Sequence, residues 1–245
     1  MPKTPTAGLV VIGNEILSGK VTDTNTPFLA RELRALGVSL ERVTVIPDEI
    51  DIVADTVADF SSRFDLVFTS GGVGPTHDDV TMEGIALAFG QPVIEHEELR
   101  RAIENFVGSR VNEAHLKMAR VPEGCELVIG DHAAFPTIVV RNVYVLPGIP
   151  EIFQDKVVSL RERFRAQPYH LRQVLVNENE TRIAEFLNAT LAAYPELLLG
   201  SYPKLSHPEY RVRLTLESKD EKYLERALAD LIERLPDGFV VRIEP

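Results

Sequence analysis

The sequence has a single cysteine, Cys125, and lacks any long hydrophobic run. One thiol cannot form an internal disulfide or a cysteine-based zinc site, and so little cysteine fits a reducing compartment. The apolar run that follows the polar residues 1–7 covers only Gly8 to Ile12, which is too short for a signal peptide or a membrane span. We therefore expect a cytoplasmic protein with no membrane partner.

Basic residues are also in short supply. The 245 residues include 26 Lys and Arg against 37 Asp and Glu, which gives a net charge of −11. The resulting field repels nucleic acids and anionic membranes, so we expect no nucleic-acid partner. An anionic small molecule must then be held by local features, such as backbone N–H groups, a helix N-terminus or a metal ion.

Several patterns of well-known catalytic sites are missing as well. The six histidines show no metal-ligand spacing, and we find neither a nucleophile elbow nor a Ser/His/Asp or Cys/His arrangement. The glycine-rich segment described below is neither a Walker A loop nor a GxGxxG motif. Its function, if it has one, must therefore be argued from its own residues.

The first 90 residues alternate between short apolar runs and amphipathic segments. This alternation predicts a mostly parallel sheet with helices on both faces. The predicted strands cover residues 8–12, 38–46 and 65–69, and the helices that follow them cover residues 27–36, 50–57 and 81–89. Farther along, we predict helices at residues 95–106, 112–119 and 151–165, and two extended segments, 134–140 and 142–146, that meet as a hairpin at Arg141-Asn142.

The pattern changes near residue 167. The later segments follow the order β-α-β-β-α-β, which is typical of a ferredoxin-like unit; they cover residues 171–176, 180–193, 197–202, 210–216, 219–234 and 239–243. We therefore predict a three-layer α/β domain of residues 1–167, followed by a small α+β domain of residues 168–245.

The strongest chemical signal lies between a predicted strand and a predicted helix, in Ser70-Gly71-Gly72-Val73-Gly74-Pro75-Thr76-His77-Asp78-Asp79. Glycines let the backbone turn tightly and approach a ligand, and successive N–H groups beside a helix N-terminus bind anions. Ligands of open α/β sheets also bind at the carboxyl ends of strands. We predict that Ser70, Gly71, Gly72, Gly74 and Thr76 bind a phosphate group, while the simpler interpretation is a turn selected for its geometry alone.

Asp78 and Asp79 follow these glycines, and two interpretations remain open for them. They could cap the next helix, or they could hold a divalent cation against a diphosphate, because hard oxygen ligands suit Mg²⁺. Two adjacent acids would repel an anionic ligand unless a metal ion intervened. We predict Asp78 and Asp79 as catalytic residues, and Asp79 with Asp23 as metal ligands.

Two more turns follow predicted strands and are expected to reach the same edge of the sheet. One is the polar loop from Asn14 to Asn25, and the other is Leu146-Pro147-Gly148-Ile149-Pro150, which is by itself more typical of a structural turn. The ligand-binding residues that we predict in them are Asn14, Glu15, Ser18, Asn25 and Gly148.

In their order, Gly13-Asn14-Glu15-Ile16-Leu17, Asp23-Thr24-Asn25 and the segment from Ser70 to Thr81 resemble the molybdopterin-binding (MoaB/MogA-like) superfamily. Residues 141–151 and Gly200-Ser201-Tyr202-Pro203 agree with this resemblance. Within the superfamily, the sequence looks most similar to the amino-terminal domain of CinA and to the molybdopterin-binding-like domain of FAD synthase. The resemblance implies a three-layer α/β domain, a small KH-like domain, and a phosphate-bearing ligand cradled by the glycine loop.

The resemblance also implies an activity. CinA-like domains are described as metal-dependent ADP-ribose pyrophosphatases and the FAD synthase counterpart as hydrolysing FAD, with Co²⁺ and K⁺ as associated ions. We therefore expect a nucleotide-diphosphate hydrolase that uses Co²⁺ or Mg²⁺, with K⁺ as a further ion. The alternatives are a molybdopterin-binding protein without hydrolysis and an assembly module. Because the superfamily is commonly oligomeric, a homodimer or other homo-oligomer is expected.

The sequence departs from these relatives at several points. Asn14 stands where many members have aspartate, and residues 131–137 replace a Gly-Thr-Ala-Pro-Gly turn of many CinA proteins, which shifts the expectation towards the FAD synthase relative. No GxxG loop follows residues 171–176, so the KH-like label does not imply RNA binding. The chain ends at Pro245, and we expect neither the deamidase activity of CinA nor FAD synthesis.

Overall fold

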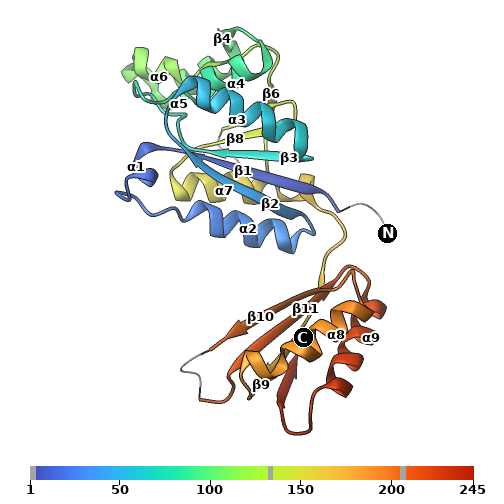
Figure 1. The fold of residues 1–245 in the computed structure, drawn as a ribbon. Helices are drawn as coiled ribbons and strands as arrows, with labels where there is room; N and C mark the ends of the chain where they lie inside the picture. Colours follow the sequence, from blue (N-terminus) through green and yellow to red (C-terminus); the bar gives the residue numbers. More distant parts are fainter. Residues whose placement is uncertain (1–3, 132–134, 205–207) are drawn as a thin grey trace. The chain divides into compact units, whose positions relative to one another are not determined.

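The computed structural model describes residues 4–131, 135–204 and 208–245, and the chain divides into two compact units. The first unit extends to Ala166 and the second begins at Gln167. Each unit has its own sheet and its own hydrophobic core (Figure 1). Along the part of the chain that the structure describes, no helix is long and apolar enough to cross a membrane.

The sheet of the first unit is mixed. Its strands are β1 (Thr6–Ile12), β2 (Ser39–Ile46), β3 (Leu66–Ser70), β6 (Glu126–Val128), β7 (Thr137–Val140) and β8 (Val143–Leu146). They lie in the order β2-β1-β3-β8-β7-β6. The strands β2, β1, β3 and β8 are parallel to one another, whereas β7 is antiparallel to both β8 and β6. The predicted hairpin at Arg141-Asn142 is confirmed by the antiparallel pairing of β7 with β8.

Helices cover both faces of this sheet. α2 (Asn25–Ala35) and α7 (Pro150–Phe164) lie on one face, and α3 (Ile50–Arg63) and α4 (Thr81–Phe89) lie on the other (Figure 1). The helices bury apolar residues at helical spacing, such as Leu29, Leu33 and Leu36 beside α7 and Val53, Val57 and Phe60 on α3, as an amphipathic face requires. The predicted three-layer arrangement is confirmed.

A subsidiary region leaves the sheet between α4 and β6. It contains β4 (Val93–Glu95), α5 (Glu97–Val107), a 3₁₀ turn η1 (Gly108–Arg110), α6 (Glu113–Lys117) and β5 (Arg120–Pro122). The antiparallel pair β4–β5 was not predicted, and neither was the short helix α1 (Asn14–Leu17), where we expected a loop. Residues 132–134, which include Ala134 of a predicted extended segment and part of the predicted departure at 131–137, lie outside the described residues.

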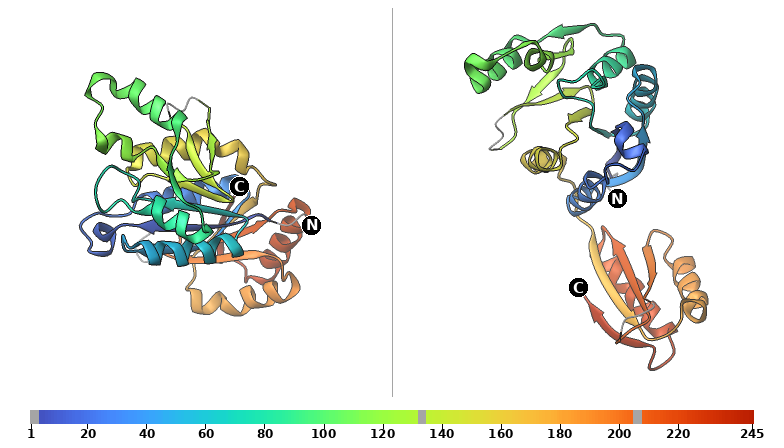
Figure 2. Two further views of the ribbon diagram at one scale, coloured as in Figure 1. Left: turned by 90° about the horizontal axis from the view of Figure 1, so that it is seen from above. Right: turned by 90° about the vertical axis from the view of Figure 1, so that its left-hand side faces the viewer.

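The second unit is an antiparallel sheet with helices on one face. Its elements are β9 (His170–Val176), α8 (Glu180–Ala193), β10 (Leu198–Pro203), β11 (Val212–Ser218), α9 (Glu221–Arg234) and β12 (Val240–Glu244). The strand order is β10-β11-β9-β12, and the turned views show the helices stacked against the same sheet (Figure 2). The predicted small α+β domain is therefore confirmed.

The core of the first unit can be tested at adjacent positions on α7. Phe153 is 0% exposed and Ile152 is 45% exposed. We predict that Phe153→Ala lowers the free energy of unfolding of this unit by about 3–5 kcal/mol, because it removes a buried ring and leaves a cavity. Ile152→Ala is the control, with an expected change below about 1 kcal/mol. Urea unfolding followed by circular dichroism measures both, and equal losses would contradict the assigned packing.

Candidate functional site

The predicted site residues gather at one edge of the first sheet. The parallel strands β1, β2, β3 and β8 end at Ile12, Ile46, Ser70 and Leu146, respectively. Because these strands are parallel, their carboxyl ends meet at the same edge. The segment 71–79, here called the glycine loop, leaves the end of β3, and α1 leaves the end of β1. This is the edge at which open α/β sheets bind ligands.

Two of the glycines in the loop are required by the backbone. Gly71 has φ +106°, and a Cβ atom there would lie 2.1 Å from the carbonyl oxygen of Ile12. Gly72 has φ +64°, and its Cβ would lie 2.3 Å from the Thr81 hydroxyl. Thr81, the first residue of α4, fixes the turn by donating its hydroxyl to Gly71 O (2.9 Å) and its N–H to Gly72 O (3.0 Å).

The backbone N–H groups of the loop are used in different ways. Gly71 N–H donates to Leu146 O at 3.2 Å, and Thr76 N–H donates to Asp79 Oδ2 at 2.7 Å. For the N–H groups of Gly72, Val73 and Gly74, no acceptor is found among the described residues. These three consecutive residues are partly exposed. Their N–H groups are therefore the ones that could donate hydrogen bonds to an anion.

Asp78 and Asp79 have different surroundings although they are adjacent. Asp79 Oδ2 accepts hydrogen bonds from the N–H and the hydroxyl of Thr76, and it closes the turn between these residues. The Asp78 side chain is exposed. Its pKa is lowered, first by the Thr76 hydroxyl and the loop backbone and then by the charges of His77 and Lys117. Asp78 therefore presents an ionised carboxylate to solvent at neutral pH.

The side chain of Asn25 connects the end of β3 with the turn that follows β8. Asn25 is 4% exposed, and its amide donates to Ser70 Oγ and to Gly148 O, each at 2.9 Å. These donations fix which amide atom is the oxygen, because the Gly148 carbonyl can only accept. The oxygen, Oδ1, is buried and has no hydrogen-bond partner among the described residues. A buried acceptor of this kind calls for a donor from water or from a ligand.

Most of the predicted residues line three hollows, whereas Gly72 and Thr76 line none of these three. The largest, about 580 Å³, is lined by Asn14, Glu15, Ser18 and Asp78 together with Leu17, Lys20 and Asp48. A smaller one of about 80 Å³ is lined by the predicted residues Glu15, Asp23, Asn25, Ser70, Gly71 and Gly148, among others. A third of about 20 Å³ contains Gly74 and Asp79. Glu15 lines both the first and the second hollow, so those two adjoin each other.

The acidic residues at this edge differ in whether their carboxylates are free to bind a divalent cation. Asp23 Oδ1 accepts hydrogen bonds from the N–H groups of Asn25 and Thr26 at the start of α2. Asp79 closes the turn at Thr76. Both carboxylates are therefore already engaged in hydrogen bonds that stabilise the local backbone. No group of three or more His, Cys, Asp or Glu residues suited to a metal ion occurs within the described ranges. Glu15, Asp48 and Asp78 line the same hollow, however. Mg²⁺ commonly binds through one or two carboxylates together with the phosphates of a substrate.

Sequence reasoning missed three charged residues at this edge. Asp48 accepts the N–H of Asn14 at 2.8 Å, and its signal was available, because Pro47-Asp48 directly follows a predicted strand. Lys20 lines the largest of the three hollows. Lys117 donates to the carbonyl oxygens of Thr76 and Asp79, and no local signal in the sequence connects it with the glycine loop.

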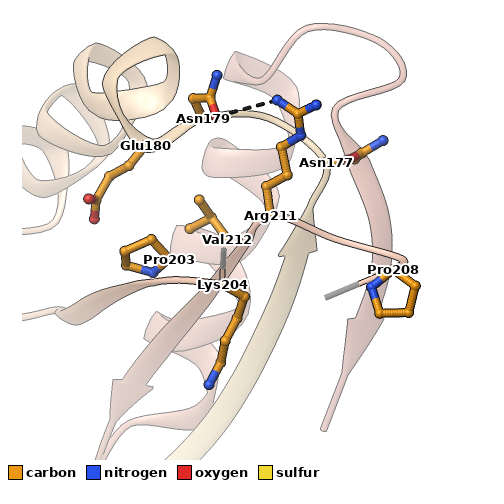
Figure 3. Close-up of a pocket in the computed structure, with 8 residues that line it drawn as sticks. All are labelled: Asn177, Asn179, Glu180, Pro203, Lys204, Pro208, Arg211 and Val212. Carbon is orange, nitrogen blue, oxygen red and sulfur yellow. Dashed lines mark hydrogen bonds between the residues drawn. The ribbon is translucent and has the colours of Figure 1, made fainter. Parts of the chain in front are cut away.

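A separate hollow of about 440 Å³ lies in the second unit, between the start of α8 and the end of β10 (Figure 3). Lys204 and Arg211 line it, and Arg211 donates to Asn179 Oδ1 at 3.4 Å. None of the predicted site residues belongs to this hollow. The predicted site residues therefore lie at the glycine-loop edge and not at this hollow.

Comparison with known proteins assigns a family to each part of the chain. Residues 8–166 match the family described as "Probable molybdopterin binding domain", and residues 168–244 match the middle domain of FAD synthase. The chain thus belongs to the molybdopterin-binding domain family. Its first unit has the fold of CinA from Thermoplasma acidophilum, a protein of unknown function, with a TM-score of 0.60 and 30% identity over 66% of this chain and 98% of that one.

Two relatives show how far the similarity extends. A protein of Archaeoglobus fulgidus is 37% identical over 94% of this chain and 97% of its own length. A Caenorhabditis elegans protein named as a probable FAD synthase is 32% identical over 98% of this chain and 52% of its own length. The chain therefore spans about half the length of this FAD synthase relative.

The close approach at Gly71 generates a prediction. Gly71 and Gly90 both have positive φ, but a Cβ at Gly90 would meet no atom within 4 Å. Gly90→Ala should therefore cost only the backbone strain of about 1–2 kcal/mol. Gly71→Ala carries the same type of strain and in addition a clash with the Ile12 carbonyl, and it should be clearly the more destabilising. Thermal unfolding of the two variants measures the difference, and similar Tm values would contradict the close packing of β1 and the glycine loop.

The Asn25 side chain generates a second prediction. Asn25→Ala leaves the Ser70 hydroxyl and the Gly148 carbonyl without their donor. The free energy of unfolding should fall by about 1–3 kcal/mol, which is the cost of leaving a buried polar group unpaired. The exposed Asn14 provides the control variant, Asn14→Ala, which should change stability by less than about 0.5 kcal/mol. A loss of that small size for Asn25→Ala would show that its amide does not join the two loops.

Proposed function

We propose that this chain hydrolyses the diphosphate of a nucleotide such as ADP-ribose or FAD. The observation that carries the proposal is the row of N–H groups at Gly72, Val73 and Gly74 that have no acceptor in the described part of the chain, in a loop that also carries the exposed carboxylate of Asp78. An anion-binding loop and acid–base groups at one sheet edge are the parts that such a reaction needs. Similarity over almost the whole chain to a protein named as an FAD synthase supports a nucleotide as the ligand.

In the proposed hydrolysis, the backbone N–H groups and the carboxylates have different roles. The N–H groups of Gly72, Val73 and Gly74 donate to the phosphoryl oxygens and stabilise the negative charge that develops as water attacks phosphorus. The carboxylate of Asp78 or of Glu15, which line the same hollow, accepts a proton from the attacking water as the bond between that phosphorus and the bridging oxygen breaks. The bridging oxygen leaves with the other phosphate group, and AMP is one of the two products. Asp78 with Glu15 or Asp48 would hold a divalent cation, which supplies Lewis-acid polarisation of the phosphoryl group when bound. The predicted metal roles of Asp79 and Asp23 remain predictions, and their present hydrogen bonds make Asp78 the stronger choice.

The test is product analysis with separate substrates. The purified chain is incubated with ADP-ribose or FAD in the presence of Co²⁺, Mg²⁺ or EDTA, with and without K⁺, and AMP is quantified by chromatography. We expect AMP to be released with a divalent cation and not with EDTA. Asp78→Asn should lower the rate at least tenfold, because the carboxylate that accepts the proton is gone.

The matched control for this experiment is Asp237→Asn, which removes an exposed carboxylate in the second unit and should leave the rate unchanged. A wild-type rate for Asp78→Asn would remove Asp78 from the mechanism. Absence of AMP with both substrates under every metal condition would refute the hydrolase.

Binding of a molybdopterin-type ligand without hydrolysis is a second candidate. It is favoured by the buried, unpartnered Asn25 Oδ1, which could accept a hydrogen bond from a pterin ring N–H, and by the description of the matching family. Mass spectrometry of the protein as purified, after acid release of bound small molecules, distinguishes this candidate. A pterin recovered together with no hydrolysis would favour it over the hydrolase.

A further inference from the structure

Lys117 reaches the glycine loop from a distant part of the chain. It is the last residue of α6, 41 residues beyond Thr76. Lys117 is a half-buried residue, and its ammonium group donates to the carbonyl oxygen of Thr76 and to that of Asp79, the latter at 3.0 Å. Thr76 and Asp79 are the two ends of the turn that the Asp79 carboxylate closes from within. Lys117 therefore holds the same turn from outside.

The positive charge of the Lys117 ammonium group is not neutralised by a direct ion pair with any carboxylate that the structure describes. Within the described residues, no carboxylate lies within ion-pair distance of Lys117, whereas many arginines of the chain are paired with Asp or Glu. Carbonyl dipoles hold an ammonium group without cancelling its charge. Lys117 thus places a positive charge beside the loop whose N–H groups at Gly72, Val73 and Gly74 are open. In a chain with a net charge of −11, an anionic ligand needs such a local charge.

We propose that Lys117 is both the positioning residue of the glycine loop and the cation that attracts the phosphate group bound there. The proposal rests on the proposed function, because it requires that the loop binds phosphate. An ammonium group serves phosphates as a point charge and has three N–H donors. Two of these can remain on the Thr76 and Asp79 carbonyls while the third faces the ligand.

The experiment separates charge from positioning with two variants of the full chain. Lys117→Met removes both the charge and the donors, whereas Lys117→Gln removes the charge but keeps N–H donors. Isothermal titration calorimetry measures the Kd for inorganic pyrophosphate, and hydrogen–deuterium exchange without ligand measures the protection of the amides at residues 72–79. We expect both variants to weaken pyrophosphate binding at least tenfold, and Lys117→Met to raise loop exchange more than Lys117→Gln.

The matched control is Arg120→Met. Arg120 lines the same small hollow as Lys117 but is exposed, and its loss should change the Kd less than twofold. A Kd within twofold of wild type in both Lys117 variants would overturn the charge role, and unchanged exchange in Lys117→Met would overturn the positioning role. If the wild-type chain itself does not bind pyrophosphate, the phosphate site of the proposed function fails, and this is seen before any variant is compared.

Discussion

The carboxyl ends of β1, β3 and β8 come so close together that their backbones are in contact at Gly71. A Cβ on Gly71 would lie 2.1 Å from the Ile12 carbonyl oxygen, and a Cβ on Gly148 would lie 3.3 Å from Gly71 Cα. The hydrogen bond from Gly71 N–H to Leu146 O extends the β3–β8 pairing beyond the strands. Because three chain segments touch through bare backbone here, the loops that leave them must start at nearly the same place. The open N–H groups and the nearby carboxylates owe their proximity to this constraint.

Adjacent residues at this edge have acquired different properties through their contacts. Asp79 faces the Thr76 N–H and hydroxyl, so its carboxylate stabilises a turn. The pKa of the exposed Asp78, one residue earlier, is lowered by the same hydroxyl and by nearby positive charge. Residue type alone does not separate these two aspartates, whereas the hydrogen bonds do. The Asp78 carboxylate is thus exposed to solvent, while that of Asp79 is engaged in holding the loop.

The sequence predicted those features that depend on local patterns. Apolar spacing predicted the three-layer domain and the β-α-β-β-α-β order of the second unit, because amphipathic faces repeat within each element. The strands β4 and β5, each of three residues, are too short for such a pattern and are defined by their pairing. α1 has only four residues, which is too short to show a helical repeat. The link from Lys117 to Thr76 depends on the path of the chain over 41 intervening positions, about which periodicity carries no information.

The walls of the candidate site come from separate segments. Glu15 and Ser18 follow β1, Asp48 follows β2, the glycine loop follows β3, Gly148 follows β8, and Lys117 arrives from the subsidiary region. All of these segments except that of Lys117 leave separate strands of the sheet. The sheet itself is held by a hydrogen-bond ladder and by apolar packing that the loops do not supply. A substitution in one of these loops can therefore change the lining of the site without breaking the sheet. An ancestor with this architecture could change its ligand through substitutions in the loops, without first losing its fold.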